Sequence, residues 1–379
     1  MIAHPPVRDV GLATDDRQSP QVVGRASVGT SGASTRRAEE RIAVSTAVRN
    51  GDEPAFTDFT ERYRRELQVH CYRMLGSFDD AEDLVQETFL RAWRKRETFQ
   101  GHSTFRAWLY RIATNACLDH LDRHPRTPVA LPAAWGAAAG ATAQLTEVPW
   151  LQPYPDHLLE PIAPSDTEPD AAAVATETIE LAYLAAIQHL PPRQRAVLIL
   201  RDVLGWTANE TAALLESTSA SVNSALQRAR ATLKQHLPDR RLDWGPAGDP
   251  SQEERAVLHR YMAATKRGDL TALAELLRED ARFTMPPTLT SYLGRDAVIA
   301  GWLPALVGPN AFTDVRHLVT AANRRPAVAT YVRHPEASAY LPVGLHVLRI
   351  EGPEIVEITA FIADVFPSFG LPATLQDTP

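Results

Sequence analysis

The chain has 379 residues, a formal net charge of −7 and 44% hydrophobic residues. This length suggests two or three domains, and the hydrophobic content is sufficient for buried cores. The acidic balance excludes a uniformly basic nucleic-acid coat, so any DNA binding must come from local patches.

Cys71 and Cys117 are the two cysteines, and they form no CxxC pair or Cys/His cluster. We therefore expect two buried thiols, with no disulfide framework and no metal site. No apolar run approaches the roughly 20 residues needed to span a bilayer, and no signal-peptide pattern opens the chain. These features predict a cytoplasmic protein with no membrane partner.

Residues 1–37 are polar and aperiodic, and we expect a disordered leader there. Helical periodicity runs over residues 38–124, and its most informative part is Asp79–Asn115. An acidic amphipathic helix comes first in that part, a basic run follows, and a second amphipathic helix is rich in aromatic residues. One face of such a unit suits a basic protein surface, and the other suits a nucleic-acid backbone and unstacked bases.

Two breaks divide this helical stretch. At the first, Ser77 and Asp80 have the spacing of a capping box. At the second, Ser103 fits an N-cap. We therefore expect one helix to begin just after each of these serines.

Residues 125–175 are rich in alanine and proline, which excludes a helix bundle and predicts a semi-extended linker. Its island at 148–155, ValProTrpLeuGlnProTyrPro, is expected to dock on a partner or on the third domain. Sequence alone leaves these two alternatives open.

Helices return at 176–237, where a helix-turn-helix is predicted. Thr207 and Glu210 have capping-box spacing, and a tight turn is expected at 216–219. The helix after the turn has an apolar stripe and a polar, basic outer face with no acidic residue. Serine, asparagine and glutamine on that face can contact base edges, while arginines hold phosphates. A plain helical hairpin with a solvated basic face is the alternative.

After a short linker at 238–249, residues 250–370 predict an α+β domain, with a tail at 371–379. The expected helices are 251–267, 269–279 and 295–307, and the expected strands, taken as an antiparallel run, are 280–285, 313–321, 327–333, 339–350 and 354–366.

Four runs of this sequence resemble pieces of bacterial sigma factors of the extracytoplasmic-function (ECF) group, and they occur in the family's order. They are AVRNGDEPAFTDFTERY (47–63), QETFLRAW (86–93), FRAWLYRIATNACLD (105–119) and LPPRQRAVLILRDVLGWT (190–207). Residues 250–370 resemble the cone-shaped SnoaL-like (NTF2-like) fold through YMAATKRGDLTALAELLREDARFTMPP (261–287) and GRDAVIAGW (294–302). The implied architecture is multidomain, with an all-α sigma region 2 at 38–124, an all-α helix-turn-helix region 4 at 176–237, and an α+β SnoaL-like domain.

The resemblance implies an initiation factor without catalytic residues or cofactors. Its expected partners are core RNA polymerase, through the β′ coiled coil and the β flap, and promoter DNA. The residues implied for the β′ coiled coil are Asp83, Gln86, Glu87 and Phe89. Those for the −10 element are Phe99, Arg106, Trp108, Tyr110, Arg111 and Asn115, with core packing as an alternative role for Trp108. Those for the −35 element are Ser221, Asn223, Ser224, Gln227, Arg228 and Arg230.

The recognition helix departs from the family at two positions. Many members carry a basic residue where this chain has Asn223, and another where it has Ala225. Fewer phosphate contacts predict weaker −35 binding and a shallower salt dependence.

The third domain offers a candidate pocket. Its polar residues are Tyr261, His317, Tyr331 and His346, with Asp280 and Asp364 as further candidates. These scattered residues do not establish the paired acid and base that proton transfer requires. An empty or structurally satisfied pocket is favoured over a site for a small-molecule ligand, and catalysis ranks last. Because this domain is fused in cis, we expect it to modulate how readily the factor engages core polymerase.

Two other functions remain open at this stage. A ligand-responsive one-component helix-turn-helix regulator would need no region 2. A SnoaL-type enzyme fused to a DNA-binding half would turn over substrate and ignore core polymerase.

Overall fold

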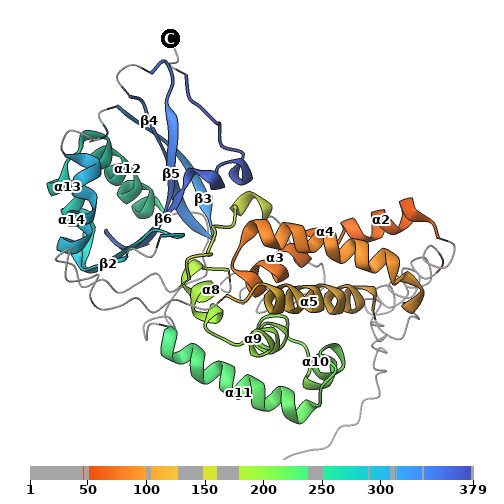
Figure 1. Ribbon diagram of the computed structural model, residues 1–379. Helices are drawn as coiled ribbons and strands as arrows, with labels where there is room; N and C mark the ends of the chain where they lie inside the picture. The colour runs from red at the N-terminus through yellow and green to blue at the C-terminus, as the bar shows by residue number, and fades with distance from the viewer. Residues whose placement is uncertain are drawn as a thin grey trace, which may run out of the picture. The chain divides into compact units, whose positions relative to one another are not determined.

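Two folded parts make up the chain: a helical part within 51–237 and an α+β part within 251–376 (Figure 1). The computed structural model describes residue 46 and the segments 51–99, 104–126, 148–159, 179–237, 251–288, 291–307, 312, 314–334 and 337–376. The predicted leader at 1–37, the linker at 238–249 and most of the linker at 125–175 lie outside these described residues.

The helical part contains two groups of helices. The first group is α2 (Glu53–Glu61), α3 (Arg64–Leu75), α4 (Phe78–Arg94), the 3₁₀ turn η1 (Arg96–Thr98) and α5 (Phe105–Arg123). The second group is α8 (Leu181–Gln188), α9 (Pro192–Leu198), the π-helical turn η3 (Ile199–Val203), α10 (Ala208–Leu214) and α11 (Ser219–His236).

The helix boundaries follow the local chemistry of capping. Gly76 ends α3 with φ 70°, a left-handed conformation that glycine adopts at little cost. Ser77 then caps α4 by accepting a hydrogen bond from the Asp80 amide, as its spacing predicts. The N-cap of α5 is Thr104, whose hydroxyl accepts from the Ala107 amide, so the prediction of Ser103 was one residue early.

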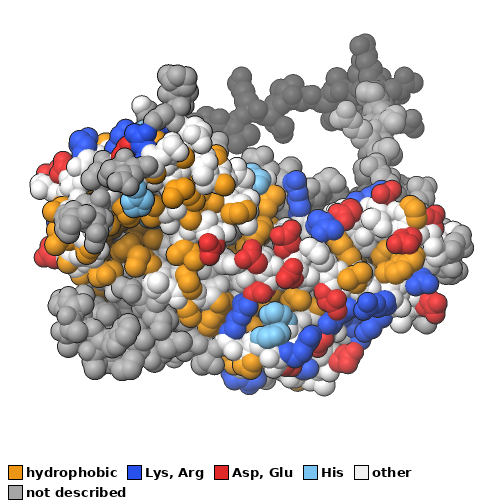
Figure 2. Space-filling view, turned by 45° about the horizontal axis from the view of Figure 1, so that its top comes forward, with side chains coloured by type: hydrophobic (Ala, Val, Ile, Leu, Met, Phe, Trp, Pro, Cys, Tyr) orange, Lys and Arg blue, Asp and Glu red, His pale blue; other side chains and the backbone are white. Residues whose placement is uncertain are grey.

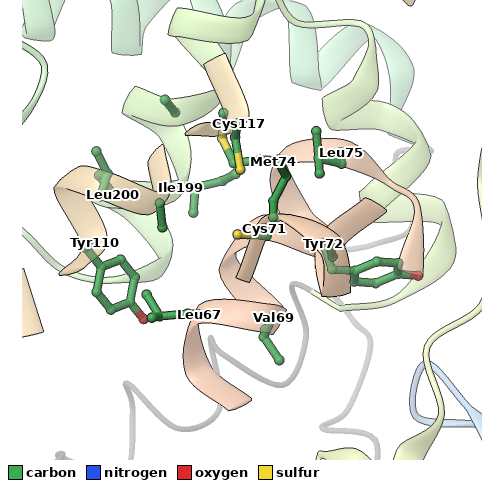
Figure 3. Close-up of a cluster of buried hydrophobic side chains, with 14 of the residues drawn as sticks. Leu67, Val69, Cys71, Tyr72, Met74, Leu75, Tyr110, Cys117, Ile199 and Leu200 are labelled. Carbon is green, nitrogen blue, oxygen red and sulfur yellow. The ribbon is translucent and has the colours of Figure 1, made fainter. Parts of the chain in front are cut away.

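One hydrophobic core joins the two groups of helices. Figure 3 shows Leu67 and Met74 of α3 in one cluster with Tyr110 of α5 and with Ile199 and Leu200 of η3. Both free cysteines lie in this core, as predicted, and neither is exposed. The second group of helices, which contains the helix-turn-helix, is therefore packed on the first group through α8, α9 and η3.

The segment 148–159 packs on the first group of helices and includes the 3₁₀ turn η2 (Asp156–Leu158). The ring of Tyr154 contacts those of Tyr72 and Phe78, at centroid distances of 5.0 and 5.3 Å. The Gln152 carboxamide accepts from the Asp79 amide at 3.0 Å and thereby caps the first turn of α4. This predicted docking island thus has a partner within its own chain.

The α+β part is a six-stranded sheet with helices on one face (Figure 1). Its helices are α12 (Gln252–Arg267), α13 (Leu270–Leu276) and α14 (Arg295–Leu306). Its strands are β1 (Leu277–Thr284), β2 (Ser291–Leu293), β3 (Val315–Ala322), β4 (Arg325–Val332), β5 (Leu341–Glu351) and β6 (Glu354–Ile362), in the order β2-β1-β6-β5-β4-β3.

The sheet is mixed, which corrects the prediction of an antiparallel run. β1 pairs with β6 in parallel, while the other pairings are antiparallel. β2 is only three residues long and was missed, because so short a strand leaves no alternating pattern in the sequence. The other predicted strands and all three predicted helices are present, with ends that differ by a few residues.

The two faces of the sheet are covered differently. Helices α12–α14 cover one face and build a core that contains Tyr261, Phe283 and Trp302. The C-terminal segment covers the other face with Phe366 and Phe369. No helix of the described part is both long and apolar enough to cross a membrane.

Candidate nucleic-acid interface

Helix α11 presents an exposed polar surface. Thr218 caps it by accepting from the Ser221 amide at 3.2 Å, and the tight turn before it contains Glu216 at φ 52°. Val222, Leu226 and Ala229 anchor its inner face. The predicted contact residues lie on the exposed face: Ser221, Asn223, Ser224, Gln227, Arg228 and Arg230.

The preceding helix fixes the position of α11. Thr207 and Glu210 form the predicted capping box of α10, in which each side chain accepts from the other's backbone amide. Ser219 donates to Asn209 at 2.6 Å, which links the start of α11 to α10. This geometry is that of a helix-turn-helix whose second helix can enter a major groove.

The two arginines of this face differ in their surroundings. Arg230 pairs with Asp202 through two hydrogen bonds of 2.6 and 2.8 Å. That contact raises the pKa of the Arg230 guanidinium. Arg228 makes no ion pair within the described part of the chain, so its charge is directly available to a phosphate.

The aromatic residues predicted for the −10 element lie inside the protein. Phe99, Trp108 and Tyr110 are 5%, 8% and 1% exposed. Phe99 and Trp108 share an aromatic cluster with Phe105, with ring centroids 5.4–5.5 Å apart. Core packing, the alternative considered for Trp108, is its role in this arrangement.

Tyr110 is covered by the second group of helices. Its ring lies 5.6 Å from that of Trp206, and its neighbour Arg111 donates to Glu216 at 2.6 Å. Arg106 donates to both carboxylate oxygens of Glu66 and lies 4.8 Å from the Tyr110 ring centroid. The predicted −10 residues thus lie on α5, except Phe99, which follows η1 and packs against α5. Most of them are engaged with other parts of the chain, and Asn115 is half-buried.

Helix α4 carries the residues predicted to bind core polymerase. Asp83 and Gln86 are exposed, whereas Glu87 pairs with Arg91 at 2.7 Å. Phe89 instead packs against the core and lies under Arg64, 4.9 Å from its guanidinium carbon.

Leu90 completes the exposed stripe of α4 and was missed by sequence reasoning. It is 52% exposed, and the other large exposed hydrophobic side chains of the described residues all lie in the α+β part. Its position seven residues after Asp83 places it on the same helical face, and that spacing was the available signal.

Arg195 joins the helix-turn-helix half to the first group of helices. It is 3% exposed and donates to the carbonyl oxygens of Met74, Ile187, Gln188 and Leu190 and to the Gln188 side chain. Burial lowers the pKa of this guanidinium to about 9. A buried cation with all of these donors satisfied specifies one arrangement of its neighbours.

The candidate pocket of the α+β part is only partly assembled. Tyr261 and His346 hydrogen-bond at 3.0 Å beneath α12. Tyr331 lies on the opposite face of the sheet, where its hydroxyl donates to the Pro372 carbonyl at 2.8 Å. It therefore does not belong with the other three, because alternate residues of a strand point to opposite faces.

His317 has both ring nitrogens satisfied in its neutral form. The Thr265 hydroxyl donates to the Tyr261 carbonyl, so it accepts from His317 Nε2 at 3.1 Å. The Thr330 hydroxyl then lies 3.3 Å from Nδ1 as its donor. Desolvation lowers the pKa of His317 to about 4 and that of His346 to about 3, so both are neutral near pH 7. The two further candidates, Asp280 and Asp364, are exposed.

No cluster of three or more metal-ligating side chains occurs among the residues that the structure describes. Figure 2 shows charged side chains of both signs over the helical part and hydrophobic side chains gathered on the α+β part.

Comparison with known proteins agrees with this geometry. Family models described as Sigma-70 region 2, Sigma-70 region 4 and SnoaL-like domain match residues 59–127, 180–233 and 258–358. The ECF RNA polymerase sigma factor SigG of Mycobacterium tuberculosis is 42% identical over 349 residues, which cover 88% of this chain and 90% of SigG. The chain belongs to the ECF sigma factors.

A second relative resembles most of the chain in fold. SigJ of M. tuberculosis is 28% identical over 250 residues, covering 63% of this chain and 69% of SigJ. The crystal structure of SigJ matches with a TM-score of 0.52 at 22% identity, covering 84% of this chain and 99% of that one. Helical sigma regions 2 and 4 followed by a SnoaL-like domain are thus the fold of this sigma factor.

Proposed function

We propose that this ECF sigma factor binds core RNA polymerase through α4 and directs it to promoters with a −10 and a −35 element. The proposed regions are 38–124 for region 2, 176–237 for region 4 and 250–370 for the SnoaL-like domain. The observation that carries the proposal is the exposed polar face of α11 on a capped helix-turn-helix, in the same chain as the acidic and apolar stripe of α4.

On α4, Asp83, Gln86 and Leu90 form the proposed contact with the β′ coiled coil. An exposed leucine between acidic and polar neighbours provides apolar burial at the centre of a charged interface. Region 4 is proposed to meet the β flap. Both contacts require the cytoplasm, where we place the protein.

We propose that the SnoaL-like domain is regulatory rather than enzymatic. A general base works best when its pKa lies near the working pH, and His346 at about 3 is far below it. A small-molecule ligand is proposed only for the cluster of Tyr261, His346 and Trp302. There, Trp302 Nε1 is buried without a hydrogen-bond partner in the described part of the chain.

The test is a binding titration of sigma-free core polymerase with the labelled full-length chain. Asp83→Arg reverses the charge of the α4 stripe and should weaken core binding about tenfold or more, because rim charges steer and orient the partner. Glu253→Arg makes the same exposed charge reversal on α12 and should leave binding unchanged. Equal affinity for both variants and the unmodified chain would remove α4 from the polymerase interface.

A further inference from the structure

The tip of the β3–β4 hairpin is buried, although a hairpin tip normally lies in solvent. Asn323 and Arg324 form the two-residue turn with φ 54° and 61°, the conformation that asparagine and glycine favour in such turns. Asn323 is 0% exposed. Burying this polar side chain costs free energy unless each of its hydrogen-bonding groups is matched.

The side chain and the amide of Asn323 all have hydrogen-bond partners, and these partners come from three separate segments of the sigma part. Its Nδ2 donates to the Tyr72 hydroxyl at 3.0 Å and to the Ile179 carbonyl at 2.7 Å. Its Oδ1 accepts from the Tyr154 amide at 2.8 Å, and its own amide donates to the Tyr154 carbonyl at 2.9 Å. One residue thus contacts α3, the inter-region linker and the entry to α8.

The residues beside Asn323 extend this contact. Pro155 and Ala322 form an isolated antiparallel bridge, and the Arg324 amide donates to Asp156 at 2.9 Å. Arg325 and Glu180 form an ion pair at 2.9 Å, with side chains only 17% and 6% exposed. Removing one partner of so buried an ion pair would leave the other charge buried and unpaired, which costs free energy. We therefore expect the contacts of the turn to form and break together.

The segments held by this turn belong to both DNA-binding regions. Tyr72 is part of region 2, and Ile179 leads into the first helix of region 4. While the two regions are held together, Trp206 packs on Tyr110 of the predicted −10 surface.

We infer that the β3–β4 turn is a clasp that holds regions 2 and 4 in a closed arrangement, and that its release uncovers Tyr110 of the predicted −10 surface. The inference rests on the proposed function, and it names the means by which the SnoaL-like domain acts on it. Because one turn holds both Tyr154 and Ile179, the entry to region 4 is kept beside region 2.

Two substitutions remove the hydrogen bonds of the clasp while they keep the conformation of the hairpin turn. Asn323→Gly keeps a residue that favours this turn and removes the three side-chain hydrogen bonds. Asn323→Asp keeps the shape and the tolerance of left-handed φ, but turns an acceptor toward the Tyr72 and Ile179 oxygens. Gly352→Asn is the matched control, because it places asparagine at φ 58° in the β5–β6 turn, where an added Cβ meets nothing within 4 Å.

The experiment measures the distance between fluorophores on Glu97→Cys in region 2 and Ala213→Cys in region 4, both exposed positions, in the full-length chain. The unmodified chain and Gly352→Asn should give one short, narrow distance distribution. Asn323→Gly and Asn323→Asp should raise the ratio of open to closed molecules by about tenfold or more, with the larger effect for aspartate.

A second readout is the affinity of each variant, bound to core polymerase, for a promoter fragment melted at the −10 element. Both Asn323 variants should bind it more tightly than the unmodified chain. Unchanged distances in folded Asn323→Asp, checked by circular dichroism, would overturn the clasp. If the unmodified chain fails to bind core polymerase, the proposed function fails, while the distance measurement still decides the clasp.

Discussion

The two helices that are proposed to contact DNA differ in how exposed their predicted contact residues are. On α11 the predicted −35 residues are polar and exposed, on a helix fixed at its start by Thr218 and Asn209. The predicted −10 aromatics, which are Phe99 just before α5 and Trp108 and Tyr110 on it, are buried, and Tyr110 lies against Trp206. The proposed −35 surface is therefore preformed, whereas the proposed −10 surface requires a rearrangement before it can contact DNA.

The difference has a physical cause. Polar side chains that contact base edges and phosphates are well solvated before DNA arrives, so their exposure costs little. Aromatic side chains that receive an unstacked base would form an exposed apolar patch in the free protein. Covering Tyr110 with region 4 avoids that patch, and the proposed capture of a base would then depend on a change of arrangement.

The largest expected effect comes from breaking the junction between the two regions. Arg195→Met removes the buried guanidinium and leaves carbonyl oxygens such as that of Met74 without donors. We expect a loss of about 3–5 kcal/mol in the free energy of unfolding, because several buried carbonyl oxygens lose their donors at once. Urea denaturation followed by tryptophan fluorescence measures it.

Arg193 provides the control for that prediction, because it is exposed and lies two residues away on the same helix. Arg193→Ala should change stability by no more than about 0.5 kcal/mol. Equal losses for the two variants would show that Arg195 is not the junction.

The next largest effect is expected from removing Arg228, the cation of the predicted −35 surface that makes no ion pair among the described residues. Arg228→Ala should abolish −35-dependent transcription while stability stays the same, because the side chain is exposed and makes no ion pair among the described residues. Arg230→Ala should do less, because that side chain is already bound to Asp202. Transcription from a promoter library, measured at two salt concentrations, ranks the two variants, and unchanged output from Arg228→Ala contradicts the assignment.

A smaller effect depends on pH at the linker. Burial raises the pKa of Asp156 to about 6, although the Arg324 amide and charge act in the opposite direction. The unfolded pKa is about 3.9, so the folded state binds the proton more tightly. The charged carboxylate of Asp156 therefore destabilises the fold above about pH 6. As pH falls from 6 toward 4 the carboxylate is protonated, and the free energy of unfolding rises by roughly 1–2 kcal/mol.

Asp156→Asn isolates this contribution. The variant should be more stable than the unmodified chain at pH 7.5, and the difference should shrink at pH 5. Thermal unfolding at the two values tests it, and a difference that does not vary with pH would contradict the raised pKa.

The smallest effect concerns a buried hydroxyl. Tyr154 is 0% exposed, and its hydroxyl has no hydrogen-bond partner among the described residues, while its ring packs on Tyr72 and Phe78. Tyr154→Phe should be neutral or stabilise the fold by up to about 1 kcal/mol, because no hydrogen bond is lost. A loss of more than about 1 kcal/mol in chemical denaturation would indicate a partner for that hydroxyl.

Much of this structure could be predicted from local sequence signals. Ser77, Thr207 and Glu210 predicted their helix starts correctly, because caps depend on neighbours three residues away. The exposed face of α11 was also predictable from local sequence, because the helical period alone places Arg228 outside and Leu226 inside.

What could not be predicted depends on contacts between residues far apart in the chain. No local pattern indicates that Asn323 meets Tyr72, or that Trp206 covers Tyr110. Tyr331 was assigned to the candidate pocket because its residue type suits a pocket, but strand register decided which face it occupies. The parallel pairing of β1 with β6 likewise follows from topology, which single-strand patterns do not encode.

The most direct test of the account is to mix the purified chain with sigma-free core polymerase and sequence the transcripts made from fragmented genomic DNA. The account predicts defined start sites that share two upstream elements, and more transcripts from them with Asn323→Gly. No specific start sites, while a known sigma factor on the same core polymerase produces its own, would contradict the central claim.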